Sequence, residues 1–228
     1  ETALAEMINE RQPANSQIVN RISDYLREAK PATMVVSGGE MMRLYGKVKG
    51  SETARQRGMY YMDIFNSSLG IDTTSNVQIH HKGKLVVGVE TIPAWLRNVG
   101  DIFAVDLGGT FGQLGIGESC MPFEHNGKKV APAICYEGLY GGHMAEFARN
   151  GSEALFVVSN DGWWGNTLGH KYLFAFCRLR AIELRRDVAR SANTGVSGFI
   201  TMQGEDVQRL EWDCRGVLTS DIRLNNKL

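Results

Sequence analysis

The sequence has no excess of charge of either sign. Its 228 residues include 25 Lys and Arg residues and 25 Asp and Glu residues, which gives a formal net charge of zero at pH 7. Proteins that bind nucleic acids need a basic surface to neutralise phosphate groups. The balanced charge gives no support for such a surface, and we therefore expect no nucleic-acid partner.

Long apolar runs and paired cysteine motifs are also missing. No stretch reaches the ~18 consecutive apolar residues of a membrane-spanning helix, and the N-terminus carries no signal-peptide pattern. The four cysteines, Cys120, Cys135, Cys177 and Cys214, form no Cys-x-x-Cys pair and match no zinc-binding spacing. We therefore predict no metal and no cofactor, in a chain long enough for one sizeable domain.

The most informative stretch that is present covers residues 131–138. Apolar residues lead into Cys135, and glycines then interrupt the chain at positions 138, 141 and 142, which predicts a buried strand that ends in a sharp turn. A thiol at such a turn is held rigidly beside backbone N–H groups that can stabilise an oxyanion, so Cys135 is a candidate nucleophile. The alternative is a small buried hydrophobic residue. Glu137, a carboxylate just past the strand, favours a functional turn.

Strands and helices alternate along most of the chain, which predicts an α/β domain in which helices cover a sheet. An amphipathic helix is predicted at residues 5–29, broken near Pro13 and capped again at Ser16. A hairpin is predicted at residues 60–71 and 77–80, with loops at 44–58 and 94–119. Further helices are predicted at residues 143–150 and 169–186, and further strands at 33–37, 128–134, 154–158, 188–192, 197–201 and 216–219.

A cysteine nucleophile needs a base or a nearby cation, since a free thiol has a pKa of about 8.5. Lys82 leads into an apolar run at residues 85–87, and a lysine held there can stabilise an oxyanion, although an ammonium that reaches solvent from a strand end is the alternative. No histidine lies in a motif that would place it near Cys135. We expect all five to be surface or packing residues: His80, His81, His125, His143 and His170.

Two adjacent tryptophans, Trp163 and Trp164, lie in a glycine-flanked loop directly after the predicted strand at 154–158. Large aromatic side chains in a loop either bury themselves or bind a ligand. The sequence allows both an apolar wall for a substrate and a corner of the core.

Four blocks of the sequence, taken together, resemble a known family. They are Ala133-Ile-Cys-Tyr-Glu137, Ser159-Asn-Asp-Gly-Trp-Trp-Gly165, Arg178-Leu-Arg-Ala-Ile-Glu-Leu-Arg-Arg186 and Arg190-Ser-Ala-Asn-Thr-Gly195. In this order they are similar to the nitrilase superfamily, and within it to the carbon–nitrogen-hydrolase-like domains of the apolipoprotein N-acyltransferase family in a form like that of Bacteroidetes. The resemblance covers essentially the whole chain and implies the nitrilase-like α-β-β-α sandwich.

The resemblance also implies a Glu–Lys–Cys triad. It places the cysteine at Cys135 and the lysine at Lys82, with Glu90 and Glu137 as accessory glutamates. The backbone N–H of Tyr136 would contribute to an oxyanion hole. The sequence departs from the family in one respect, since Val87 stands where the family has a proline.

The triad glutamate has two candidates, Glu1 and Glu40. The family motif is Pro-Glu-Thr-Ala, and the chain opens with Glu1-Thr-Ala-Leu4. A helix and a strand follow the family's glutamate before its lysine, and only Glu1 leaves room for both. We therefore expect Glu1 to be the base and residues 1–228 to be a catalytic domain truncated at its N-terminus, without a preceding membrane domain and the first strands of the sheet.

The implied activity is transfer of a fatty acyl group from a phospholipid to the N-terminal amine of an apolipoprotein's S-diacylglyceryl cysteine. The resemblance implies an inner-membrane protein whose catalytic domain faces the periplasm, with Trp163 and Trp164 as candidate lipid-binding residues at a membrane-facing mouth. Two other functions stay open. One is a soluble nitrilase-superfamily amidase with water as acceptor, and the other is an inactive domain that serves as a scaffold.

Overall fold

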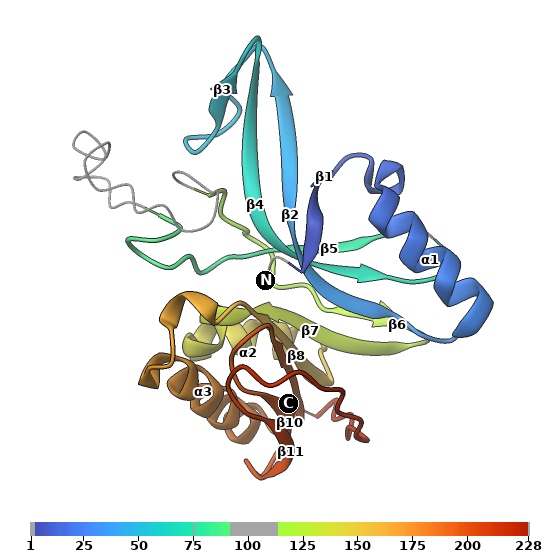
Figure 1. The fold of residues 1–228 in the computed structure, drawn as a ribbon, viewed down its shortest axis with the longest axis vertical. Helices are drawn as coiled ribbons and strands as arrows, with labels where there is room; N and C mark the ends of the chain where they lie inside the picture. The colour runs from blue at the N-terminus through green and yellow to red at the C-terminus, as the bar shows by residue number, and fades with distance from the viewer. Residues whose placement is uncertain (1–2, 75, 92–113, 228) are drawn as a thin grey trace.

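The computed structural model describes residues 3–74, 76–91 and 114–227. These residues form a five-stranded sheet and a six-stranded sheet, with helices outside them (Figure 1). The first sheet contains β1 (Leu4–Asn9), β2 (Val35–Gly46), β3 (Arg55–Arg57), β4 (Tyr60–Ile71) and β5 (Gln78–His81). The second contains β6 (Phe123–His125), β7 (Lys128–Ile134), β8 (Ala154–Ser159), β9 (Val188–Ala192), β10 (Ser197–Ile200) and β11 (Asp206–Leu210).

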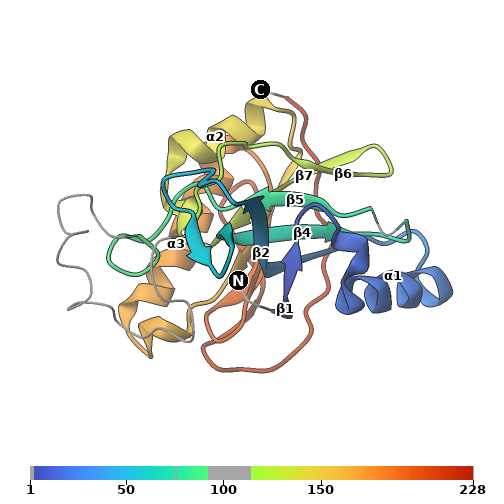
Figure 2. The same cartoon turned by 90° about the horizontal axis from the view of Figure 1, so that it is seen from above.

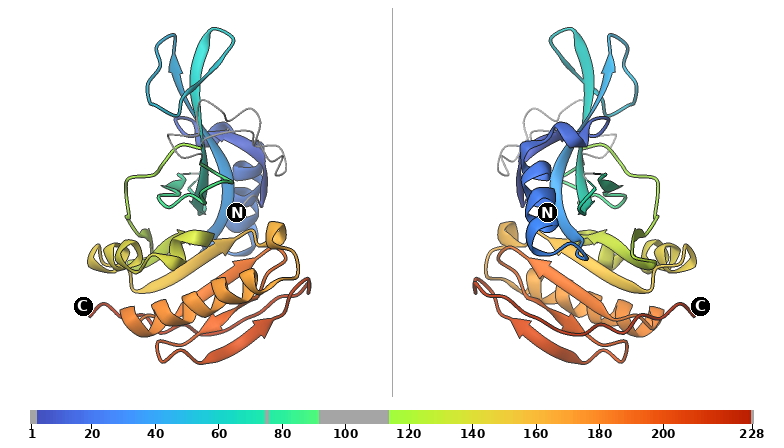
Figure 3. Two further views of the ribbon diagram at one scale, coloured as in Figure 1. Left: turned by 90° about the vertical axis from the view of Figure 1, so that its left-hand side faces the viewer. Right: turned by 90° about the vertical axis from the view of Figure 1, so that its right-hand side faces the viewer.

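The two sheets stack through β4 on β7 and β2 on β8, and helices cover their outer faces (Figures 2 and 3). Helix α1 (Gln17–Ala29) packs on β4, whereas α2 (Gly141–Arg149) and α3 (Leu168–Leu184) pack on the second sheet. This α-β-β-α order confirms the fold class predicted from the sequence. Burial of apolar side chains between each sheet and its helix is the main force that holds such layers together.

The prediction of a helix at residues 5–29, broken near Pro13, was wrong for the part before the break. Residues 4–9 form β1, which pairs in parallel with β2, and a short 3-10 helix, η1 (Pro13–Asn15), precedes α1. Leu4 and Ile8 fill the core below α1 from the strand, so their apolar character serves a sheet. The cap was predicted correctly, since the Ser16 hydroxyl accepts a 3.2 Å hydrogen bond from the Val19 N–H.

The first sheet contains a long antiparallel pair, β2 with β4, which projects from the body of the molecule (Figure 1). The predicted strand at 33–37 is its beginning, and the predicted loop at 44–58 contains the end of β2 and the short edge strand β3. The hairpin of β4 and β5 is confirmed. β5 leads directly into Lys82 and so starts the loop that the site uses.

In the second sheet, β7, β8 and β9 run in parallel in the order of the chain. Their C-terminal ends therefore meet at one edge of the sheet, which is where functional groups collect in parallel sheets. The strand predicted at 216–219 was wrong, because the partner of β10 is β11, reached through a turn at Gly204. Most of the predicted loop at 94–119 lies outside the described residues. In the described part of the chain, no helix is both long and apolar enough to cross a membrane.

Candidate active site

Cys135 is the first residue of a 3-10 turn, η3 (Cys135–Leu139), directly after β7. Its φ angle is +44°, a left-handed backbone conformation that residues other than glycine rarely adopt. Strained backbone of this kind is concentrated at functional sites, where surrounding structure holds it in place. The Cys135 side chain is buried with Ile134, Val158 and Leu173, as the predicted strand and turn require.

Lys82 immediately follows β5 and is fully buried, with 0% of its surface exposed. Its ammonium lies 2.8 Å from Glu90 Oε1. The same carboxylate accepts hydrogen bonds from the Asn66 side-chain amide (2.9 Å) and from the Val86 N–H (2.8 Å). The alternative of a lysine that reaches out to solvent is therefore wrong. The structure therefore brings Lys82 and Glu90 together, and their roles in catalysis stay predictions.

Glu137 joins the turn after β7 to the loop after β5. One carboxylate oxygen accepts the Gly83 N–H at 2.7 Å, and the other accepts the Ile134 N–H at 2.8 Å. Gly83 follows Lys82, and Ile134 precedes Cys135. A single side chain therefore fixes the backbone next to both candidate reacting groups.

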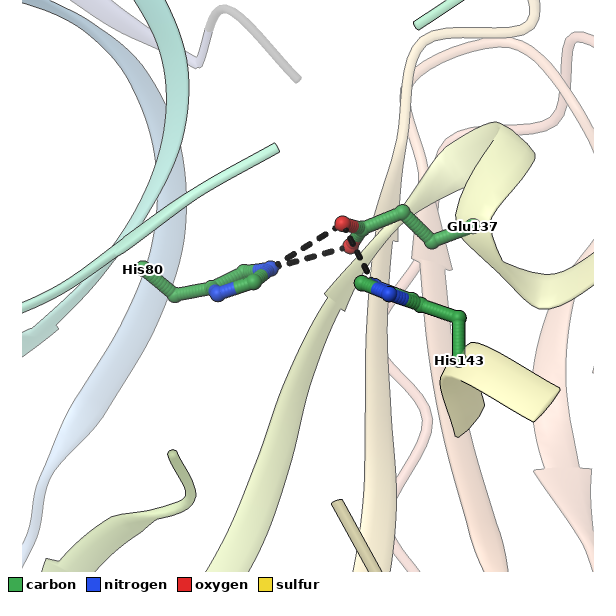
Figure 4. Close-up of side chains that lie close together, drawn as sticks. All are labelled: His80, Glu137 and His143. Atoms are coloured by element: carbon green, nitrogen blue, oxygen red, sulfur yellow. Dashed lines mark hydrogen bonds and ion pairs between the residues drawn. The ribbon is translucent and has the colours of Figure 1, made fainter. Parts of the chain in front are cut away.

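Two histidines complete the contacts of Glu137 (Figure 4). His80 Nε2 lies 3.1 Å from one carboxylate oxygen, and His143 Nε2 lies 2.9 Å from the other. Burial on its own raises the pKa of the Glu137 carboxyl, but the charge of His80 and the hydrogen bonds of His143 and His80 outweigh burial and hold that pKa well below its usual range. The Glu137 carboxyl is therefore ionised although it is fully buried.

The expectation that all five histidines are surface or packing residues was wrong for His80 and His143. They come from β5 and α2, elements that are remote in sequence and meet only through the stacking of the sheets. No local motif marks them. The signal in the sequence was Glu137 itself, because a carboxylate at a buried strand end requires donors or positive charge around it.

A second buried ion pair lies at the ends of β8 and β9. The Arg190 guanidinium is 2.9 Å from Asp161, which also accepts the Ser159 hydroxyl at 2.6 Å. Burial lowers the pKa of Arg190, but its interactions with Cys177 and Asp161, and more weakly with Cys135, raise it overall.

Trp164 packs against the cluster that contains Cys135 and belongs to a 3-10 turn, η4 (Gly162–Trp164). Both of the predicted settings, core corner and wall of the site, agree with this position. The Trp163 side chain lies outside what the structure describes. Tyr136 packs against the same cluster, and its backbone belongs to the turn that starts at Cys135.

Of the two candidate bases, Glu1 lies outside the described residues. Ala3 is described, and it lines a pocket of about 170 Å³ with Val158, Ser159 and Asn193. Glu40 lies on β2 directly opposite Asn66, whose side chain contacts Glu90. Glu40 is therefore one strand away from the Lys82–Glu90 pair.

One group in the described ranges has donor atoms close enough to share a metal ion: those of His80, Glu137 and His143 lie within 4.8 Å of one another. Their separations of 2.9–3.2 Å are hydrogen-bond lengths. The predicted absence of a metal stays a prediction.

The chain belongs to the carbon–nitrogen hydrolase family, whose sequence model matches residues 8–226. The fold is also that of a crystal structure of an amidase from Nesterenkonia sp., with a TM-score of 0.51, 14% identity, and coverage of 85% of this chain and 62% of that one. At this identity the likeness concerns the fold alone.

Within this family the sequence is similar to apolipoprotein N-acyltransferases. It is 40% identical to that of Chlorobaculum tepidum over 100 residues, 44% of this chain and 19% of that protein. It is 33% identical to that of Allorhizobium ampelinum over 165 residues, 71% of this chain and 30% of that protein. The chain thus spans less than a third of the length of these relatives.

Proposed function

We propose that this chain is the catalytic domain of an N-acyltransferase that uses Cys135 to carry a fatty acyl group as a thioester. The donor is a phospholipid, and the acceptor is the N-terminal amine of the S-diacylglyceryl cysteine of an apolipoprotein. The names of the similar proteins support the reaction class. The single observation that carries the chemistry is the strained turn at Cys135, tied through Glu137 to the loop of Lys82.

In the first half-reaction Glu1 removes the thiol proton, and Cys135 sulfur attacks the carbonyl carbon of the phospholipid ester. The Lys82 ammonium and the Tyr136 N–H stabilise the oxyanion that forms. The bond between that carbon and the glycerol oxygen then breaks. Glu1 returns its proton to this oxygen, and a lysophospholipid leaves.

In the second half-reaction the amine of the apolipoprotein attacks the thioester carbon, and Glu1 takes a proton from its nitrogen. The carbon–sulfur bond breaks, an amide forms, and the proton passes to the Cys135 thiolate. The thiol is regenerated, so no oxidant, reductant or cofactor is needed.

The position of Ala3 supports Glu1 as the base. Ala3 lines the same pocket as Val158, and Val158 pairs with Ile134, the residue before Cys135. Glu1 is two residues from Ala3, a span of at most about 7 Å along the chain. We also propose that the full-length protein resides in the inner membrane with this domain facing the periplasm, and that Trp163 and Trp164 contact lipid.

The test is the intact mass of the full-length gene product after incubation with phospholipid vesicles. We expect one added acyl group, its loss in Cys135→Ala, and its retention in the control Cys214→Ala, because Cys214 is exposed and does not belong to the turn at Cys135–Leu139. Release of the acyl group on addition of a diacylglyceryl peptide completes the cycle. Hydrolysis of small amides without an acyl adduct would replace this proposal with an amidase.

A further inference from the structure

The hydrogen-bond partners of His80 fix its protonation. Its Nδ1 lies 3.1 Å from the Ser119 carbonyl oxygen, and its Nε2 lies 3.1 and 3.2 Å from the two oxygens of Glu137. A carbonyl and an ionised carboxylate only accept hydrogen bonds. Both ring nitrogens of His80 must therefore donate, which only the imidazolium form does.

The partners of His143 lead to a different assignment. Its Nδ1 lies 3.3 Å from Cys120 Sγ, and burial raises the pKa of the Cys120 thiol to about 12. The thiol therefore keeps its proton, and its S–H group is the hydrogen-bond donor to Nδ1 of His143. Neutral His143 then donates from Nε2 to Glu137.

The cluster of His80, Glu137, His143 and Cys120 thus contains one positive and one negative charge. Both charges are withdrawn from solvent, since His80 is 3% exposed and Glu137 is 0% exposed. Four groups donate to the carboxylate, and two of them are the N–H groups of Gly83 and Ile134. If the carboxylate became neutral, one of these backbone segments would lose its acceptor, and if it turned away both would.

We propose that His80 is a positioning residue, held as an imidazolium by its two acceptors, that keeps Glu137 ionised and thereby holds the Lys82 loop against the Cys135 turn. The inference rests on the proposed function only in taking Lys82 and Cys135 as the reacting pair. His80 touches neither of these side chains in the contacts described above, and it acts through the Glu137 carboxylate.

The alternative occupant of the space between these side chains is a metal ion. The geometry favours hydrogen bonds over metal coordination. The nitrogen–oxygen distances are those of hydrogen bonds, and both oxygens of the Glu137 carboxylate already accept a backbone N–H. A metal ion remains an outcome that the experiment detects.

The first measurement is the ¹⁵N NMR spectrum of the full-length protein labelled in histidine, with His80 assigned by its loss in His80→Gln. We expect the two similar nitrogen shifts of an imidazolium for His80 and the two separate shifts of a neutral ring for His143. This readout needs no turnover, so it stands even if the proposed acyl transfer fails. Separate shifts for His80 would overturn the proposal.

The second measurement compares variants that keep or remove the charge. His80→Gln keeps donor groups but is neutral, whereas His80→Lys retains a cation next to Glu137. A misplaced reacting group costs about 100-fold in rate. We therefore expect the rate of thioester formation on Cys135 to fall about 100-fold in His80→Gln, with KM nearly unchanged. The rate in His80→Lys should be at least about tenfold higher than the rate in His80→Gln.

The matched control is His125→Gln, since His125 contacts the Ala32 carbonyl away from the cluster, and its rate should equal that of the wild type. Equal losses in His80→Gln and His80→Lys would show a packing role and overturn the proposal. Elemental analysis completes the test: one equivalent of metal in the wild type that is missing from His80→Gln would replace the imidazolium with a metal site.

Discussion

Two glutamates hold the two sides of the candidate site in different ways. Glu90 binds a side chain, the ammonium of Lys82, and its own side chain is 12% exposed. Glu137 has no exposed surface and binds the backbone on both sides of the site, at Gly83 and Ile134, together with two histidines. Glu90 therefore orients the side chain of one candidate reacting group, whereas Glu137 holds two segments of the chain together.

This difference predicts that Glu90 matters more for the reaction rate and Glu137 more for the stability of the fold. A contact to a side chain can be lost while the backbone stays in place, so its removal should affect rate more than folding. A buried anion that holds two backbone segments and balances a buried cation cannot be lost in that way, because an unpaired buried charge is costly. Substitutions at the two regions should therefore separate in their effects on stability and on rate.

The largest effect on stability is expected for Glu137→Gln. The neutral side chain leaves the His80 imidazolium without its counter-charge and turns a donor toward one of the backbone N–H groups. Removal of one partner of a buried ion pair typically costs about 3–5 kcal/mol. Urea denaturation should show a loss of this size in the free energy of unfolding.

The control for this variant is Glu124→Gln, in which a carboxylate whose side chain is 57% exposed loses its charge. We expect a change within about 0.5 kcal/mol. If Glu137→Gln were as mild as this control, Glu137 would not hold the two segments together.

The turn at Cys135 could be predicted from the sequence, whereas the contacts of Glu137 could not. The apolar run before Cys135 and the glycines after it are local signals, and the structure has a strand and a turn at these residues. His80 and His143 reach Glu137 from two elements that no local pattern brings together. Such contacts depend on how the sheets stack, which the sequence shows only through the family resemblance.

The N-terminal region shows a second limit of the sequence. Leu4 and Ile8 have a spacing that suits both a helix face and a strand buried on one side. Their state is decided by β2, which lies more than twenty residues further along the chain and pairs with them. The cap at Ser16, in contrast, depends on neighbours within three residues, and it was predicted correctly.

Among the variants compared in this Discussion, Lys82→Met is expected to have the largest effect on the reaction rate. Methionine fills a similar volume, and Glu90 keeps its hydrogen bonds from Asn66 and Val86, so the fold should persist. Loss of one donor to an oxyanion typically lowers kcat about 10²–10³-fold. The rate of thioester formation on Cys135 measures this loss.

Lys84→Met is the matched control, because Lys84 lies in the same loop with its ammonium 5.7 Å from the centre of the Tyr140 ring. Its rate should stay within twofold of the wild type. Equal rate losses in the two lysine variants would mean that the loop, and not the Lys82 ammonium, limits the reaction.

A smaller effect is expected from acid. The folded-state pKa of Glu137 lies below the value of about 4.3 for an unfolded glutamate, so its contribution to stability is complete above pH 4.3 and is lost as the pH falls through the folded-state pKa. One proton bound on unfolding gives a slope of about 1.4 kcal/mol per pH unit below pH 4. Urea denaturation from pH 5 to pH 3 gives the free energy of unfolding at each pH. The slope of this free energy against pH should be shallower in Glu137→Gln than in the wild type by this amount. An unchanged slope would mean that Glu137 does not titrate differently in the folded and unfolded states.

The smallest effect on stability is expected for Glu90→Gln, which tests the other half of the comparison. The glutamine oxygen can still accept from Lys82 and Asn66, so the Lys82 ammonium keeps a neutral acceptor in place of a carboxylate that is itself 12% exposed to solvent. The hydrogen bond from the Val86 N–H is replaced by two facing donors. Loss of one such hydrogen bond costs about 1–2 kcal/mol, less than the cost predicted for Glu137→Gln. Urea denaturation measures this cost, and Glu118→Gln, at an exposed position, provides the baseline.

The rate should respond more strongly than the stability in Glu90→Gln, because the Lys82 ammonium loses the charge that orients it. We expect thioester formation to fall by about tenfold, a change that corresponds to about 1.4 kcal/mol in the barrier. A stability loss as large as that of Glu137→Gln, without a loss of rate, would reverse the roles of the two glutamates. In that case Glu90 would hold the fold, and the orientation of Lys82 would have to come from another of its contacts.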